Sequence, residues 1–290
     1  MKVTIGLPCY NAAAWLTDCI KSILNQTHQD WILLAADDGS QDTTADILNS
    51  FAARDSRIVV IRDGKNLGLA ARLNQFAQLC ETELLFRMDS DDIMHLERLA
   101  RETAFLMANP DCDLVASAVY AIDGNNQVRT LRQGRASNPT PADLFSGEVI
   151  FHPSVAGRRE WFRSNLYDES LRLSEDYELW CRQAGKMKVA ILDQPLLFYR
   201  EHGSFKYSKY RSQAAITVAV LRRHGPSRIG SIATTRLIAI RKLKNLVYAI
   251  INACGQWEKA LDRHGNALSH EQREAAESAL RQALAPVTIL

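Results

Sequence analysis

The sequence lacks several patterns that mark other classes of protein. No two of its six cysteines are spaced as Cys-x-x-Cys, so neither a zinc ribbon nor a redox pair is indicated. No apolar run approaches the roughly 20 residues that a membrane span requires. The stretch before Pro8 is too short for a signal peptide, so we expect a cytoplasmic protein whose thiols stay reduced.

A glycine-rich dinucleotide fingerprint is also absent. The first strand-like run covers residues 3–7, and no Gly-x-Gly-x-x-Gly follows it, which argues against a dinucleotide-binding oxidoreductase. Of the 290 residues, 47% are hydrophobic and 23% are charged, which is typical of a globular protein and not of a disordered one. We therefore expect one sizeable folded unit, with room for an appendage.

Acidic residues are missing from one long segment. Residues 202–257 carry ten basic side chains and no acidic one, whereas residues 1–201 carry 21 basic and 28 acidic ones. The net charge of +2 hides this asymmetry. The change near residue 202 predicts a domain boundary, and the basic segment suits contact with an anionic membrane surface.

Strand-like and helix-like segments alternate through the first 120 residues. Such alternation predicts an α/β fold whose mostly parallel sheet is covered by helices on both faces. Residues 123–141 are rich in Gly, Asn, Gln and Pro and are expected to form a loop or a short hairpin. The expected strands cover residues 3–7, 31–36, 58–61, 84–88 and 114–119, and the expected helices cover residues 15–24, 43–51, 69–80 and 96–107.

The most informative motif is Arg87-Met88-Asp89-Ser90-Asp91-Asp92, which follows the apolar run Leu84-Leu85-Phe86. Open α/β sheets bind ligands at the C-terminal ends of their strands. There, Asp-x-Asp can hold Mg²⁺ or Mn²⁺ while the phosphates of a substrate complete the coordination. The alternative is an ordinary turn followed by a helix cap. Polar residues also end the first two strands, at 8–11 and 37–40, and would meet the Asp cluster at one sheet edge.

Two later segments are expected to be helical. Ser174-Glu175-Asp176 precedes an apolar run and marks a helix start, although a pure capping role for the two acids stays open. Residues 212–255 follow a helical pattern with a break expected at Gly225-Pro226. The apolar stripe of that segment comprises Ile238, Leu243, Leu246, Val247, Ile250 and Ile251, and Arg236, Arg241, Lys242 and Lys244 surround it.

Together these motifs resemble those of inverting family-2 glycosyltransferases with the GT-A nucleotide-diphospho-sugar transferase fold. The resemblance covers about residues 2–202, keeps the motifs in order, and points to bacterial enzymes of capsule, exopolysaccharide and lipopolysaccharide assembly. The motifs are Pro8-Cys9-Tyr10-Asn11, Ser22-Ile23-Leu24-Asn25-Gln26-Thr27, Asp37-Asp38-Gly39-Ser40-x-Asp42, Asn66-x-Gly68-x-x-x-Arg72-x-Asn74, Asp89-Ser90-Asp91-Asp92 and Glu175-Asp176-Tyr177-Glu178-Leu179-Trp180, with His152-Pro153-Ser154 and Tyr199-Arg200-x-His202 in support.

The resemblance implies a domain plan and a donor site. A GT-A catalytic domain would cover residues 1–205, with a nucleotide-sugar-binding half (1–120) and an acceptor-binding half (121–205), and a helical basic region would cover residues 206–290. Six residues would bind the nucleotide, and the sixth, Asp89, also belongs to the metal site described below. Pro8, Tyr10 and Asn11 would line the base and ribose pocket, Asp38 would accept a hydrogen bond from a uracil N3–H, and Arg72 would meet the base or the diphosphate.

The resemblance also assigns the metal and the chemistry. Asp91 would bind a divalent cation, Mn²⁺ or Mg²⁺, directly, and Asp89 would lie near the ribose and the metal. His202 is a further candidate for a metal ligand or a diphosphate contact. Asp176 would be the catalytic base, with Glu175 beside it in the acceptor site. A single base opposite the leaving group inverts the anomeric centre.

The implied reaction moves a hexosyl or N-acetylhexosaminyl group from a nucleotide sugar, with UDP favoured, to a hydroxyl of a glycan or lipid-linked glycan. A processive polysaccharide synthase is disfavoured because membrane spans and Gln-x-x-Arg-Trp are absent, and a non-catalytic nucleotide-sugar-binding protein would not need Asp91 and Asp176. Residues 202–257 favour peripheral contact with the inner face of the plasma membrane. The alternative is a helical appendage packed on the catalytic domain, and no motif supports nucleic-acid binding.

Overall fold

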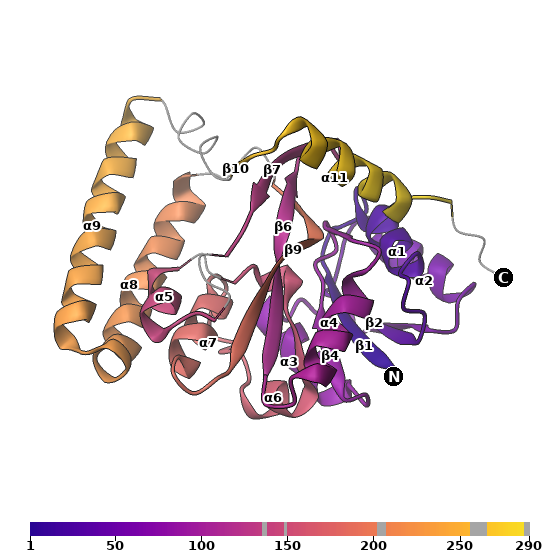
Figure 1. The fold of residues 1–290 in the computed structure, drawn as a ribbon, viewed down its shortest axis with the longest axis horizontal. Helices are drawn as coiled ribbons and strands as arrows, with labels where there is room; N and C mark the ends of the chain where they lie inside the picture. The colour runs from indigo at the N-terminus through magenta and orange to yellow at the C-terminus, as the bar shows by residue number, and fades with distance from the viewer. Residues whose placement is uncertain (135–137, 148–149, 202–206, 256–265, 287–290) are drawn as a thin grey trace.

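The computed structural model describes residues 1–134, 138–147, 150–201, 207–255 and 266–286. These residues form a ten-stranded sheet whose main path runs β10-β7-β6-β8-β4-β1-β2-β3, with β9 paired to β5 and β6. Helices pack against the sheet, and a long helical hairpin, α8–α9, lies at one end of the molecule (Figure 1).

Four parallel strands form the N-terminal half of the sheet, in the order β3-β2-β1-β4. The register aligns Cys9 with Asp37 and Gly6 with Arg87. Because the strands are parallel, their C-terminal ends lie at one edge, as the sequence predicts. The strands are β1 (Val3–Cys9), β2 (Trp31–Asp37), β3 (Ile58–Arg62) and β4 (Leu84–Arg87).

Helices cover both faces of these strands. Successive side chains of a strand point to opposite faces, so Leu33 joins a buried cluster with α1 while its neighbour Leu34 joins another with α3. This two-sided burial explains the near-continuous apolar runs of the strands. The helices are α1 (Leu16–Leu24), α2 (Thr44–Ala52), α3 (Leu69–Leu79) and α4 (Arg98–Ala108).

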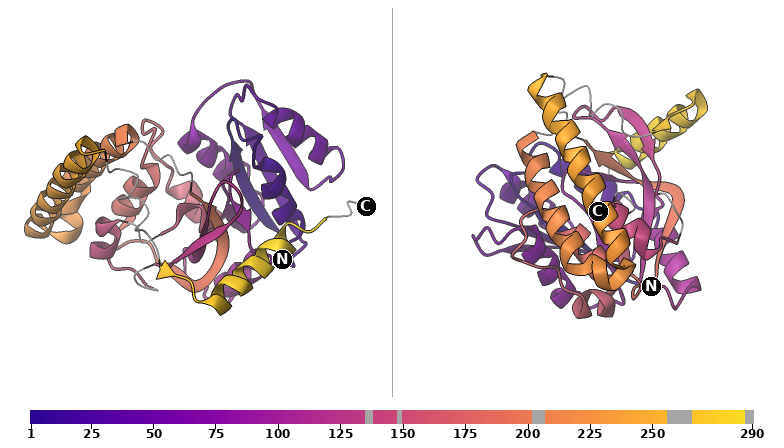
Figure 2. Two further views of the ribbon diagram at one scale, coloured as in Figure 1. Left: turned by 90° about the horizontal axis from the view of Figure 1, so that it is seen from above. Right: turned by 90° about the vertical axis from the view of Figure 1, so that its left-hand side faces the viewer.

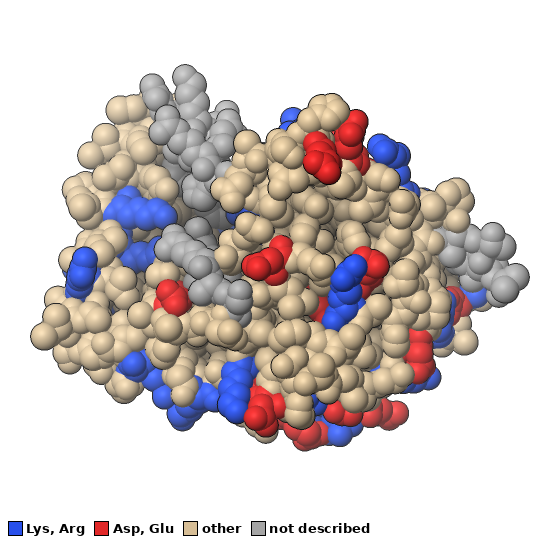
Figure 3. Space-filling view, viewed as in Figure 1, with Lys and Arg blue, Asp and Glu red and all other residues tan. Residues whose placement is uncertain are grey.

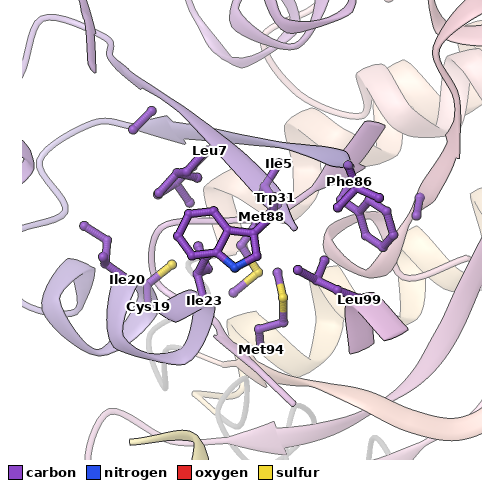
Figure 4. Close-up of a cluster of buried hydrophobic side chains, with 14 of the residues drawn as sticks. Ile5, Leu7, Cys19, Ile20, Ile23, Trp31, Phe86, Met88, Met94 and Leu99 are labelled. Atoms are coloured by element: carbon purple, nitrogen blue, oxygen red, sulfur yellow. The ribbon is translucent and has the colours of Figure 1, made fainter. Parts of the chain in front are cut away.

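The first of these clusters anchors the residues that lead into the site (Figure 4). Trp31 is fully buried at its centre, with Ile23 of α1 on one side and Phe86 and Leu99 on the other. Met88 belongs to the same cluster and is also fully buried. The residue directly before Asp89 is therefore fixed by core packing.

The second half of the sheet mixes strand directions. β6 pairs in parallel with β9 and antiparallel with β7 and β8, and β8 pairs antiparallel with β4. The β6–β7 hairpin agrees with the expectation for residues 123–141, whereas β8 and β9 are not among the expected strands. The elements are β5 (Ile93–Met94), β6 (Leu114–Ile122), β7 (Val128–Arg132), α5 (Pro141–Ser146), a 3₁₀ turn (His152–Ser154), β8 (Ala156–Arg158), α6 (Arg159–Ser164), α7 (Glu175–Gln183), β9 (Val189–Arg200) and β10 (Asn266–Ala267).

The helical hairpin consists of α8 (Tyr207–Ile229) and α9 (Ser231–Ala253). The break expected at Gly225-Pro226 is wrong, because α8 continues through both residues and the chain turns at Gly230, where φ is +83°. Gly225 serves packing instead: a Cβ there would lie 2.5 Å from Oγ1 of Thr234 in α9. The missing side chain lets the two helices approach closely.

After the hairpin the chain returns to the sheet. Helix α11 (His270–Ala283) buries Ala276 and Leu280 in a cluster with Ile93 of β5, Ile122 of β6 and Val128 of β7. Nδ2 of Asn25 donates hydrogen bonds to the carbonyl oxygens of Ala283 (2.9 Å) and Ala285 (3.0 Å). Residues 206–290 are thus not one uniform helical segment, since α11 packs on the first half of the chain.

The close approach of α8 and α9 gives a stability prediction. In Gly225→Ala the added methyl group would overlap Thr234, and we expect the free energy of unfolding to fall by about 1–2 kcal/mol, because overpacking outweighs the better helix propensity of alanine. Urea unfolding measures this loss, with Gly124→Ala as the control, since a Cβ there has no atom within 4 Å. A second change, Thr234→Ala, should restore part of the loss. Equal stability of Gly225→Ala and wild type would contradict the packing.

Candidate active site

The loops after β1 and β2 are joined by side-chain hydrogen bonds. The Asn11 N–H donates to Ser40 Oγ (3.0 Å), and the Gln41 N–H donates to Asn11 Oδ1 (2.8 Å). The Ala12 N–H donates to Thr44 Oγ1 (2.8 Å). Asn11 has a left-handed φ of +48°, a conformation that non-glycine residues adopt mainly where the surroundings hold them. These contacts hold the loops after β1 and β2 against each other.

Asp38, directly after β2, connects the end of this strand to the start of α3. Its carboxylate accepts hydrogen bonds from the backbone N–H groups of Leu67 (2.8 Å) and Gly68 (3.0 Å) and from Nε of Arg72 (2.8 Å). A carboxylate offers about four acceptor positions, so one remains for a ligand donor. The predicted contact with a uracil N3–H fits this count and stays a prediction.

Arg72 is fully buried and uses all five of its N–H donors on the protein. Besides Asp38, its guanidinium contacts both carboxylate oxygens of Asp63 (2.7 and 2.9 Å), Gln75 Oε1 (3.0 Å) and the Lys65 carbonyl (2.8 Å). These bonds hold the pKa of Asp63 well below its ordinary value. Arg72 therefore shapes the wall of the site, and a contact between it and a diphosphate would require exchange of a partner.

A cavity of about 310 Å³ opens between these loops and the end of β4. Tyr10 lines this cavity and has 53% of its surface exposed, so its ring is accessible for stacking. Seven predicted donor and metal residues meet here. The cavity is lined by Pro8, Cys9, Tyr10, Asn11, Ala12, Trp15, Asp38, Leu69, Arg72, Asp89, Ser90 and Asp91.

Three carboxylates gather at the end of β4. Oxygen atoms of Asp89, Asp91 and Asp92 lie within 4.8 Å of one another. Oδ1 of Asp92 accepts the Arg200 N–H (2.7 Å), whereas its buried Oδ2 has no hydrogen-bond partner among the described residues. Three carboxylates whose hard oxygen atoms lie this close together fit a divalent cation such as Mg²⁺ or Mn²⁺.

Two buried arginines support the Asp cluster at the end of β4. Nη2 of Arg87 is 2.7 Å from Oδ1 of Asp89, and Nη2 of Arg98 donates to the Arg87 carbonyl (2.9 Å). Arg98 is itself fully buried and paired with Glu102 at 3.3 Å. Burial raises the pKa of Asp89 above its ordinary value, and the charge of Arg87 opposes this shift. The arginines thus fix the backbone and the orientation of the first Asp.

Helix α7 brings a second pair of carboxylates to the site. The expected helix start is confirmed, but Ser174 makes no side-chain cap and has a left-handed φ of +59°. Burial, reinforced by the charge of Asp176, raises the pKa of Glu175 to about 7. Burial also raises the pKa of Asp176, whose charge in turn raises that of Asp89. The α7 acids therefore lie within electrostatic reach of Asp89.

Two histidines belong to the supporting motifs, and the structure describes only one of them. His202 lies outside the described residues, so its metal or diphosphate role stays a prediction. His152 is buried, and its Nε2 lies 2.9 Å from the hydroxyl of Tyr167. Burial lowers its pKa well below the ordinary value, which suits a neutral structural imidazole.

Some contributors were not among the expected site residues. Asp92 belongs to the same motif as Asp91, and its buried Oδ2 could be found only from the packing around it. Thr44 looks like an ordinary residue at a helix start. Arg98 and Glu102 have the i, i+4 spacing of a surface ion pair, and nothing local reveals that both are fully buried.

The family model "Glycosyl transferase family 2" matches residues 4–166, which is more than half of the chain. The chain belongs to glycosyl transferase family 2. The matched range contains every cavity residue and the β4 acids, whereas Glu175 and Asp176 lie beyond it.

Relatives in the family differ in length. An uncharacterised glycosyltransferase of Methanocaldococcus jannaschii is 28% identical over 230 residues, which cover 77% of this chain and 79% of that protein. The putative glycosyltransferase EpsE of Bacillus subtilis is 31% identical over 187 residues, or 62% of this chain and 66% of EpsE. The poly(ribitol-phosphate) beta-glucosyltransferase of Bacillus spizizenii is 28% identical over 173 residues, or 59% of this chain, but the match spans only 26% of that enzyme.

Solved structures of glycosyltransferases share the fold. The crystal structure of S. aureus TarS 1–349 with UDP-GlcNAc matches with a TM-score of 0.64 and 15% identity, over 98% of this chain and 88% of TarS 1–349. The mannosyltransferase PcManGT of Pyrobaculum calidifontis, with GDP-Man and Mn²⁺, matches with a TM-score of 0.58 and 17% identity, over 97% and 85% of the two chains. The GT-A fold expected from the sequence is confirmed. Within the described residues, no helix is both long and apolar enough to cross a membrane.

The Arg72 network gives a testable prediction for this family-2 site. Arg72→Lys keeps the charge but loses the paired contacts to Asp63, and we expect about 2 kcal/mol less stability and weaker UDP binding, because the wall around Asp38 loosens. Arg101→Lys is the control, because Arg101 makes only an exposed pair with Glu97 (2.8 Å) and should change stability by less than about 0.5 kcal/mol. Chemical unfolding and calorimetric UDP titration provide the two readouts. If the two variants had equal stability and equal UDP affinity, Arg72 would not be the residue that supports the cavity wall around Asp38.

Proposed function

We propose that this family-2 enzyme transfers a sugar from a nucleotide diphosphate donor, a UDP-sugar, to a hydroxyl of a glycan or lipid-linked glycan, with inversion at the anomeric carbon. The observation that carries the proposal is the meeting of two carboxylate groups beside one cavity. Asp89 and Asp91 line the cavity itself, and Glu175 and Asp176 of α7 lie within electrostatic reach of Asp89. The transferred sugar would lie between the two groups.

The donor would enter the cavity with its base at the Tyr10 end. The Tyr10 ring offers an aromatic face, and Asp38 retains one acceptor position for the N3–H of uracil. Pro8 and Asn11 would line the ribose pocket. The complexes of TarS with UDP and with UDP-GlcNAc support a UDP-sugar, whereas the complex of PcManGT contains GDP-Man. Asp38 is the residue that favours uracil here.

The diphosphate would lie toward the end of β4. Asp89 and Asp91 would hold a divalent cation, Mn²⁺ or Mg²⁺, with the unpaired oxygen of Asp92 beside them. A cation bound there supplies positive charge to the leaving diphosphate and orients it. Arg87 keeps Asp89 in place through its 2.7 Å contact, so the ligand oxygens are positioned in advance.

The acceptor hydroxyl would be activated by Asp176. Burial raises its pKa, which makes the carboxylate a stronger base than an ordinary Asp. Glu175, with a pKa of about 7, would hydrogen-bond the acceptor from the neighbouring position. Attack from the α7 side, opposite the diphosphate, is a single displacement and produces inversion.

The biological setting proposed is bacterial surface polysaccharide synthesis, that is, of exopolysaccharide, capsule or lipopolysaccharide. The similarity to the poly(ribitol-phosphate) beta-glucosyltransferase supports a surface polymer as acceptor. We place the enzyme in the cytoplasm, peripherally bound through residues 202–257 to the anionic inner face of the plasma membrane, where lipid-linked acceptors lie. Metal-dependent release of UDP from a UDP-sugar would separate this transferase from a non-catalytic binding protein.

The assignment of the base gives a prediction. Asp176→Asn keeps the size of the side chain but removes its basicity, so turnover should fall by roughly 10²-fold or more while UDP affinity stays unchanged. UDP release with a panel of acceptor glycosides measures turnover, and Asp193→Asn on the exposed part of β9 is the control. Turnover close to that of wild type would move the base to another residue.

A further inference from the structure

One face of α9 is apolar and exposed to solvent. Six large aliphatic side chains of this helix are between 45% and 89% exposed. They make up a large share of the exposed large hydrophobic side chains among the described residues. We call them the α9 face. They are Ile232, Ile240, Leu243, Leu246, Val247 and Ile250.

The spacing of these residues places them along a single stripe. Steps of three, four, seven or eight residues return to the same side of a helix, so the α9 face forms one band about 27 Å long. Of the residues in the expected apolar stripe, Ile238 and Ile251 are partly buried, and Ile238 packs against a buried cluster. The structure thus separates an outward stripe from an inward one.

The inward side of α9 is already occupied. Thr234 is buried against Gly225, and the Tyr248 ring meets the Tyr210 ring edge-on at 5.0 Å. Arg241 donates a hydrogen bond to the Ser146 carbonyl of α5. A helix that is apolar on both sides is normally covered on both, so the α9 face is expected to have a partner.

The charges around the α9 face identify that partner. Arg236 lies within the stripe, Lys242 and Lys244 lie beside it, and residues 207–255 contain no acidic residue. Figure 3 shows basic but no acidic side chains over α9, whereas acidic side chains are spread over the rest of the face in view. A second copy of the chain docked face to face would bring like charges together without an acidic counterpart. An anionic lipid surface offers negative headgroups and an apolar layer at once.

We propose that the α9 face inserts shallowly into an anionic lipid surface with the helix axis parallel to that surface. This inference rests on the proposed function, which it deepens by naming the docking surface. The aliphatic side chains would enter the acyl boundary, while Arg236 and Lys242 would extend their charged ends to the headgroups. Figure 2 (right) shows α9 in front of α8, and the side chains of the α9 face are exposed among the described residues, so they are accessible for such contact.

The hairpin also connects this surface to the catalytic acids. Arg228 of α8 donates to the Arg182 carbonyl of α7 (2.7 Å), and His224 Nε2 is 2.9 Å from Glu178 Oε1. The helix that begins with Glu175 and Asp176 is therefore fixed to the hairpin. Docking through the α9 face would hold the acceptor side of the site at a constant distance from the lipid surface.

Vesicle binding tests the proposal directly. The protein is sedimented with phosphatidylglycerol vesicles and with phosphatidylcholine vesicles, each at low and at high salt. Wild type should bind only the anionic vesicles, and less at high salt. Leu243→Gln/Leu246→Gln and Arg236→Gln/Lys242→Gln should each lower the partition coefficient by about tenfold or more. The matched control Leu79→Gln/Met107→Gln changes two side chains that are similarly exposed, in α3 and α4, and should bind as wild type.

Two further measurements separate the possible outcomes. Circular dichroism and UDP titration on each variant show whether the fold and the donor site survive, so a failure of the proposed function is seen independently of vesicle binding. Light scattering gives the oligomeric state. Wild type that stays in the supernatant with anionic vesicles overturns the proposal. So does a wild-type dimer that Leu243→Gln/Leu246→Gln converts to a monomer, because the α9 face would then join two copies.

Discussion

The parallel register of β1, β2 and β4 is the constraint on which the site depends. It aligns Cys9 with Asp37 and Gly6 with Arg87, so the three strands end at the same edge of the sheet. The loops that follow must then share one small volume, and their polar side chains satisfy one another there. The cavity and the Asp cluster lie side by side because the strands carry them to this edge, and α7 adds its acids to the same region.

Much of the site consists of buried charges that hold other groups. Asp38 and Arg72 fix the wall of the cavity, and Arg98 and Arg87 fix the backbone and side chain at Asp89. Burying such groups is costly unless nearly every donor and acceptor is paired, as the five bonds of Arg72 illustrate. Pairing is incomplete around the Asp cluster, where Oδ2 of Asp92 and Nε and Nη1 of Arg87 have no hydrogen-bond partner among the described residues. A preorganised set of oxygens of this kind is what a metal-assisted transfer requires.

The sequence predicted the strand-end motifs and the parallel half of the sheet, because apolar runs and their polar ends are local signals. It could not predict β8 and β9, which are set by pairing with distant strands, or the burial of Arg98 and Glu102. Seven of the nucleotide and metal candidates line one cavity, whereas His202 lies outside the described residues. The prediction of a break at Gly225-Pro226 was wrong, because α8 continues through both residues. Gly225 instead allows close packing against Thr234 of α9, a contact that no local pattern reveals.

The central claim is that the Asp cluster and the cavity form one metal-dependent site for a uridine diphosphate. Calorimetric titration of UDP into wild type and Asp91→Ala, each with and without Mn²⁺, tests this claim most directly, with Asp111→Ala as the exposed control. We expect Mn²⁺ to raise the affinity of wild type and of the control for UDP by at least about tenfold, and to have no such effect on Asp91→Ala. An equal effect of Mn²⁺ on all three proteins, or no effect on wild type, would contradict the account.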